Sequence, residues 1–200
     1  RLRTTWRHTR QWVHDTRVTS NISGTGLQED TMTRALIVVE SYFGNTRAIA
    51  EAVAAGLIEG GIEAQMVDVA QAPGTLPEDL DLLILGAPTH NRGLPTAATR
   101  AKACAQAGSG KASHGIGGWL ETTVIPASTT AAAFDTVISK GWLSGSAAKA
   151  LAKALQRQQG RRTASIRSFV VTASKGPLAP GQESDAHSWG RELAVSVGSR

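Results

Sequence analysis

The stretch Ala35-Leu36-Ile37-Val38-Val39-Glu40-Ser41-Tyr42-Phe43-Gly44-Asn45-Thr46 decides the fold. Its first five residues are apolar and rich in β-branched side chains, which is typical of a strand buried on both faces in a parallel sheet. Residues 41–46 then form a short polar segment with one glycine. After it, residues 47–57 carry apolar side chains at helical spacing, at Ile49, Val53 and Leu57. The sequence therefore predicts a strand, a loop and a helix.

The loop between this strand and this helix can bind an anion. The first N–H groups of a helix, with its positive dipole end, point at whatever lies above the end of the strand. Side chains of Ser41, Asn45 and Thr46 add hydrogen-bond donors. Gly44 lets the backbone approach a ligand closely or adopt a positive φ. A purely structural role also fits, because Asn45 or Thr46 can serve as the N-cap of the helix.

The pattern Ser41-x-x-Gly44-Asn45-Thr46 resembles the loop that binds the phosphate of flavin mononucleotide (FMN) in the flavodoxin family, usually [S/T]-x-[S/T]-G-x-T. Phe43 stands where a hydroxyl residue is usual, which leaves that position only its backbone N–H. The resemblance extends over residues 33–197. It implies that the cofactor FMN is bound by Ser41, Tyr42, Phe43, Gly44, Asn45 and Thr46.

Apolar runs and turn residues alternate along the rest of the chain. Further strands are expected at 62–69, 80–85, 131–137 and 165–173, and further helices at 96–107, 146–156 and 184–197. Loops are expected at 71–78 and 108–118, with the 80–85 strand ending at Gly86. This order favours right-handed crossovers and a parallel sheet. The resemblance implies the fold class α/β, a flavodoxin-like three-layer sandwich with a five-stranded parallel sheet of order 2-1-3-4-5.

The segment Gly86-Ala87-Pro88-Thr89-His90-Asn91-Arg92-Gly93-Leu94-Pro95 follows the third expected strand. In flavodoxins the matching loop, often G-x-P-T-W, surrounds the isoalloxazine ring, and here His90 takes the place of the tryptophan. Without the resemblance, this is a turn rich in Pro and Gly. Ligands of doubly wound sheets, however, bind at the carboxyl ends of the strands. The resemblance therefore implies a second group of cofactor-binding residues: Pro88, Thr89, His90, Asn91, Arg92 and Gly93.

A third loop runs from Asp135 to Gly145, before the helix expected at 146–156. Flavodoxins place a second aromatic residue here against the outer face of the flavin, and Trp142 is the candidate. A hydrophobic staple for the following helix is the alternative role of Trp142. Arg92 and Lys140 would place positive charge beside the flavin, where classical members are acidic. The cofactor-binding candidates of this loop are Asp135, Thr136, Lys140 and Trp142.

Residues 1–31 differ in kind from the rest. They hold five Arg, two Trp and two His without sustained apolar periodicity, and Met32 follows them. We interpret them as an extension outside the fold, disordered or non-native, and residues 32–200 as one flavodoxin-like domain. An organelle-targeting peptide rich in Arg and Ser or Thr is the alternative.

Composition and missing motifs exclude several classes of function. The formal charge of the 200 residues is +5, without a basic stripe interleaved with aromatics, so no nucleic-acid partner is expected. No run of about twenty apolar residues occurs, so no membrane insertion is expected. The single Cys104 excludes an internal disulfide and fits a reducing compartment, which favours a cytoplasmic location. Metal-ligand spacings, GxGxxG, Walker A and G-x-S-x-G are all absent from the sequence.

The resemblance implies an FMN-binding electron-transfer protein that works with a reductase and an acceptor protein. In such proteins the flavin carries the chemistry, so no side chain is assigned a catalytic role. Two alternatives stay open. One is an NAD(P)H-dependent flavin or quinone reductase on the same fold. The other is a flavodoxin-like domain that has lost FMN binding, to which Phe43 and His90 point.

Overall fold

The computed structural model describes residues 33–108, 114–139, 145–159 and 163–198. Five parallel strands form one sheet of order β2-β1-β3-β4-β5, which confirms the predicted topology. The strands are β1 (Arg34–Val39), β2 (Glu63–Asp68), β3 (Leu82–Pro88), β4 (Thr130–Val137) and β5 (Thr163–Val170). The helices are α1 (Asn45–Glu59), α2 (Ala97–Ala107), α3 (Gly115–Thr122), α4 (Ala147–Gln159) and α5 (Gln182–Gly198), and a short 3-10 turn spans Val69–Gln71.

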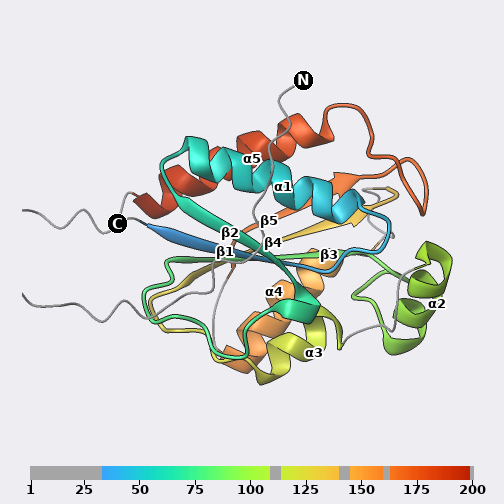
Figure 1. The fold of residues 1–200 in the computed structure, drawn as a ribbon, viewed down its shortest axis with the longest axis horizontal. Coiled ribbons are helices and arrows are strands. Elements are labelled where there is room, and N and C mark those ends of the chain that lie inside the picture. Colours follow the sequence, from blue (N-terminus) through green and yellow to red (C-terminus); the bar gives the residue numbers. More distant parts are fainter. Residues whose placement is uncertain (1–32, 109–113, 140–144, 160–162, 199–200) are drawn as a thin grey trace, which may run out of the picture. The chain divides into compact units, whose positions relative to one another are not determined.

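Helices cover both faces of the sheet (Figure 1). Successive residues of a strand point to opposite faces, so the continuous apolar run of β1 feeds two cores. Ala35, Ile37 and Val39 pack into the core under α1 and α5. Leu36 and Val38 pack into the core with α3 and α4. This burial on both faces explains why the run is apolar throughout rather than alternating.

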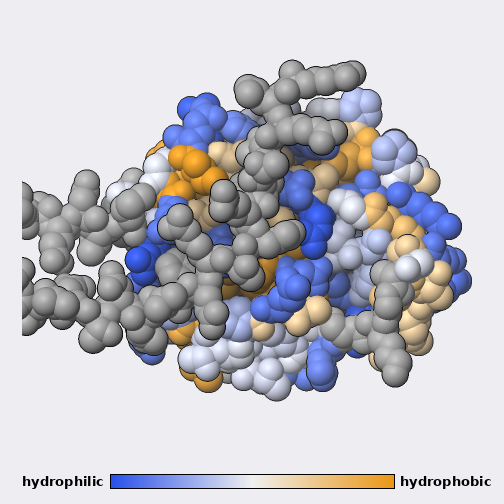
Figure 2. Space-filling view, viewed as in Figure 1, coloured by the Kyte–Doolittle hydropathy of each residue, from blue (hydrophilic) through white to orange (hydrophobic). Residues whose placement is uncertain are grey.

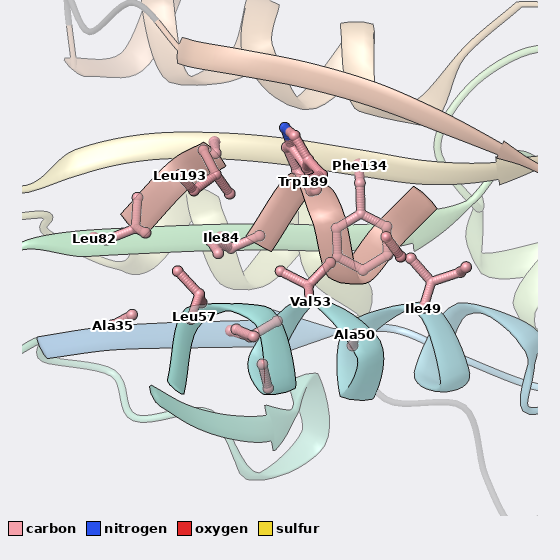
Figure 3. Close-up of a cluster of buried hydrophobic side chains, with 14 of the residues drawn as sticks. Ala35, Ile49, Ala50, Val53, Leu57, Leu82, Ile84, Phe134, Trp189 and Leu193 are labelled. Atoms are coloured by element: carbon pink, nitrogen blue, oxygen red, sulfur yellow. The ribbon is translucent and has the colours of Figure 1, made fainter. Parts of the chain in front are cut away.

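The core under α1 and α5 contains Trp189, the largest fully buried side chain among the described residues. Figure 3 shows Trp189 and Leu193 of α5 gathered with Phe134 of β4 and with Val53 and Leu57 of α1. Trp189 is 1% exposed and Leu193 is 3% exposed, so both lie on the buried face of α5 as their spacing indicates. Aromatic packing therefore ties α5 to the sheet.

Two glycines let α1 and α5 approach each other closely. A Cβ atom at Gly56 would lie 2.1 Å from the carbonyl oxygen of His187. A Cβ atom at Gly190 would lie 2.3 Å from the carbonyl oxygen of Val53. Any larger residue at either position would force the helix backbones apart, since real Cβ contacts are far longer.

The outer surface is mixed in character. Hydrophilic and hydrophobic residues are interspersed over the described surface that Figure 2 shows. The large exposed hydrophobic side chains of the described residues are Ile58, Val124, Ile138, Ile166 and Val195. No helix in the described part of the chain is long and apolar enough to span a bilayer.

The prediction that residues 108–118 form a loop is wrong from Gly115 onward, where α3 begins. Ile116, Trp119 and Leu120 are buried against the sheet at spacings of three and four residues. Burial of this apolar face outweighs the low helix propensity of the three glycines within α3. Trp119 is thus a core residue.

The prediction that β3 ends at Gly86 is also wrong, because the strand continues to Pro88. Gly86 has a packing role. A Cβ atom there would lie 2.2 Å from the ring of Phe134, so the missing side chain makes room for this ring. The extra strand residues pair with β4, which brings Pro88 level with Thr136. β5, by contrast, is shorter at its end than predicted, because it ends at Val170 rather than at residue 173.

Candidate functional site

The loop after β1 presents unpaired backbone donors. Gly44 is the N-cap of α1, with φ of 88°, and has no side chain that could cap the helix, so the alternative in which Asn45 or Thr46 is the N-cap is wrong. Among the described residues, no acceptor pairs with the backbone N–H groups of Phe43, Gly44, Asn45 and Thr46. Four such donors at the positive end of a helix fit an anion such as a phosphate.

Side chains of the same loop are engaged within the protein. The hydroxyl of Thr46 is buried and lies 2.9 Å from the hydroxyl of Thr136. The amide of Asn45 donates to the carbonyl oxygen of Lys175 at 3.1 Å. Ser41 Oγ accepts from the backbone N–H of Arg47 at 3.3 Å. These contacts hold the loop in shape and leave its backbone N–H groups for a ligand.

A cleft of about 370 Å³ lies at the carboxyl ends of the strands. This volume falls within the range of small-molecule sites. The cleft brings together residues of the first two predicted loops with Thr136 at the end of β4. Nine of the predicted residues line it: Tyr42, Phe43, Asn45, Thr46, Pro88, Thr89, His90, Asn91 and Thr136.

Helix α2 forms a wall of this cleft that the sequence did not indicate. Figure 1 shows α2 beyond the carboxyl ends of the strands. Thr99, Lys102, Ala103 and Gln106 of α2 line the cleft. These residues belong to an Ala-rich helix without a recognisable motif, so only the chain path reveals their place.

The loop after β3 ends in a tight turn. Asn91 and Arg92 have φ of 46° and 70°. His90 and Gly93 exchange two backbone hydrogen bonds of 2.9 Å, which closes a two-residue hairpin of the type that needs positive φ at both positions. Arg92 is exposed and packs against Gly145, where a Cβ atom would lie 2.2 Å from the carbonyl oxygen of Arg92. Arg92 and Gly93 are outside the lining of the cleft.

Two aromatic rings lie together on the wall of the cleft. The ring centroids of Tyr42 and His90 are 5.6 Å apart, with 32° between the ring planes. Burial lowers the pKa of His90, which favours the neutral imidazole at physiological pH. The two rings offer flat, uncharged surface to a planar ligand.

Glu40 is a buried carboxyl beside this wall, and the sequence analysis did not select it. It is 3% exposed, and its Oε2 accepts from the backbone N–H of Ile116 at 2.9 Å. Tyr42 donates its hydroxyl hydrogen to Glu40 Oε1. Glu40 therefore anchors the Tyr42 side chain and joins the first loop to the start of α3. The one sequence signal that could have selected Glu40 is its place directly after the apolar run of β1.

Burial also raises the pKa of Glu40 above the ordinary value of 4.5, against the lowering effect of its hydrogen bonds. The folded protein therefore binds more protons than the unfolded chain from pH 4.5 up to the raised pKa, and stability falls as pH rises through this interval. We therefore compare the wild type with Glu40→Gln, which does not titrate at this position. The difference between their free energies of unfolding, wild type minus variant, should decrease from pH 4.5 to neutrality. Urea unfolding of both proteins measures this, and a pH-independent difference would contradict it.

Asp135 lies in β4, within the strand expected at 131–137, and is fully buried there. Its Oδ2 accepts from the hydroxyls of Thr89 and Ser146 at 2.9 and 2.7 Å and from the backbone N–H of Ala148 at 3.1 Å. Asp135 thus caps α4 and fixes Thr89, and it does not line the cleft. Lys140 and Trp142 lie outside the described residues, as does the extension 1–31.

Known structures share this architecture. Flavodoxin from Streptococcus pneumoniae superposes with a TM-score of 0.59 at 16% identity, over 82% of this chain and 100% of that one. Oxidised Flavodoxin 1 from Bacillus cereus gives 0.57 at 20% identity, over 82% and 98%. The flavodiiron protein from Giardia intestinalis gives 0.57 at 16% identity, over 83% of this chain but 36% of that one. These similarities show the fold.

Sequence comparison defines the family. None of the curated proteins matches this chain. The model of the flavodoxin family, however, matches residues 37–189, which include the end of β1, the first loop and the buried face of α5 up to Trp189. This match spans more than half of the sequence, and the chain belongs to the flavodoxin family.

Proposed function

We propose that this protein binds FMN and carries electrons between redox proteins. The observation that supports it best is the row of four unpaired backbone N–H groups at residues 43–46, three of which, Phe43, Asn45 and Thr46, line the cleft. An FMN phosphate is an anion that needs several donors, and this donor set suits it. The membership in the flavodoxin family points to the same cofactor.

Different residues around the cleft would bind the phosphate and the ring system of FMN. The backbone of residues 43–46 would hold the phosphate, with the hydroxyl of Ser41 as a further donor. Tyr42 and His90 would supply flat surface for the ring system. When bound, FMN supplies reversible transfer of one or two electrons, and the protein supplies position and electrostatics. Phe43 and His90 replace usual family residues without closing the cleft.

The test separates an electron carrier from the alternative, a reductase on the same fold. FMN-loaded protein is mixed anaerobically with NADH or NADPH, with and without a separate flavoprotein reductase, and flavin absorbance is followed. We expect bleaching only with the reductase, and its reversal on addition of an oxidised acceptor such as cytochrome c. Free FMN at equal concentration is the control. Sustained turnover with NADH or NADPH alone would instead identify an enzyme.

A further inference from the structure

The segment that follows β5 packs directly on the loop of residues 41–46. The carbonyl oxygen of Lys175 accepts from the amide of Asn45 at 3.1 Å. Gly176, with φ of 93°, touches the same amide, because a Cβ atom there would lie 2.4 Å from Asn45 Nδ2. Only glycine allows this approach without displacement or backbone strain. The backbone at Lys175 is therefore held against the loop that we propose as the phosphate-binding loop.

Hydrogen bonds inside the segment keep it in this position. The backbone N–H and the hydroxyl of Thr172 both donate to the carbonyl oxygen of Pro177, at 2.8 and 3.1 Å. The N–H of Gly176 donates to the carbonyl oxygen of Ala173 at 2.9 Å. These hydrogen bonds fix the backbone of the turn, so the side chain of Lys175 starts from a defined position.

The ammonium group of Lys175 lies over the ring of Phe43, at the residue where the first loop lacks a side-chain donor. Lys175 Nζ is 5.9 Å from the ring centroid of Phe43, the residue that replaces the usual hydroxyl side chain. No carboxylate of the described residues pairs with Lys175, although several other basic side chains form ion pairs. The side chain is exposed and long enough to move between the ring and an anion on the loop.

We propose that Lys175 binds the phosphate monoester of FMN and replaces the donor that is missing at Phe43. This inference rests on the proposed function. A phosphate monoester carries about −1.5 to −2 charges at neutral pH. Lysine is a point charge that binds phosphate without demanding a fixed geometry. Lys175 is thus a determinant of selectivity for FMN over riboflavin, which lacks the phosphate.

The test measures dissociation constants of FMN and riboflavin by quenching of flavin fluorescence, for the wild type, Lys175→Met, Lys175→Arg and Lys153→Met. Lys153 is an exposed lysine of α4, on the other face of the sheet, so its variant removes the same charge elsewhere. We expect Lys175→Met to weaken FMN binding about tenfold and to leave riboflavin unchanged. Lys175→Arg should restore most of the affinity, and Lys153→Met should change neither constant.

Salt gives an independent signature. Added salt should weaken FMN binding to the wild type more than to Lys175→Met, because the variant has lost one screened attraction. An unchanged FMN constant in Lys175→Met, or an equal loss for FMN and riboflavin, would overturn the inference while FMN binding by the wild type still stood. A wild type that binds neither flavin would contradict both this inference and the proposed function.

Discussion

Trp189→Ala is expected to lower the free energy of unfolding by about 3–5 kcal/mol, as truncation of large buried aromatic residues does. The ring of Trp189 is 6.1 Å from the rings of both Phe134 and Phe169 and packs edge-on against Phe134. Its Nε1–H donates to the hydroxyl of Ser165 at 2.8 Å. Removal of the side chain would open a cavity between α5 and the sheet and leave the Ser165 hydroxyl without this donor.

Urea unfolding, followed by far-UV circular dichroism, measures this loss. Trp189→Phe is the matched control, because it keeps an aromatic ring in the core and removes the hydrogen bond to Ser165. We expect its loss to be clearly smaller than that of Trp189→Ala. A loss below about 1 kcal/mol for Trp189→Ala would show that this aromatic cluster does not hold α5 on the sheet.

Gly56→Ala is expected to destabilise the protein by about 1–3 kcal/mol or more, although alanine is the better helix former. The added methyl group would lie 2.1 Å from the carbonyl oxygen of His187. Backbone atoms of α5 cannot swing aside as a flexible side chain can, so the two helices must separate. Separation would loosen the buried contacts around Val53 and Leu57.

Gly117→Ala provides the comparison. Gly117 also lies within a helix, α3, but a Cβ atom there would meet only Leu94 Cδ1 at an ordinary 3.7 Å. This variant should therefore gain up to about 1 kcal/mol from helix propensity. Thermal and urea unfolding of both variants decide the matter. Equal effects of the same sign would show that helix propensity, and not the close crossing of α1 and α5, controls the response at Gly56.

The opening stretch of sequence predicts the part of the fold that depends on local pattern. The apolar run of β1 and the helical spacing of Ile49, Val53 and Leu57 are local signals, and the structure confirms the strand and the helix that they indicate. The strand order, which the structure also confirms, is implied by the family resemblance. Gly86 shows the limit of such signals. A glycine after an apolar run usually ends a strand, but here its role depends on Phe134 of the neighbouring strand.

The residues of the candidate site could be predicted from the sequence where they lie in one loop. Contacts between residues far apart in the sequence could not be predicted. Glu40 accepts from Ile116, 76 positions away, and Asn45 donates to Lys175, 130 positions away. No spacing rule covers such pairs, because the fold alone brings them together. Asp135 illustrates a third case: a polar residue inside a strand is consistent with ligand contact, but burial and three hydrogen bonds assign it to the start of α4.

The central claim, that the loop of residues 41–46 is a phosphate site for FMN, is tested most directly by titration of the purified wild type with FMN and with riboflavin. Loss of the phosphate would remove hydrogen bonds from up to four backbone N–H groups at the start of α1. We therefore predict that FMN binds at least about 100-fold more tightly than riboflavin, a difference of about 2.7 kcal/mol. Equal dissociation constants for the two flavins would contradict the claim.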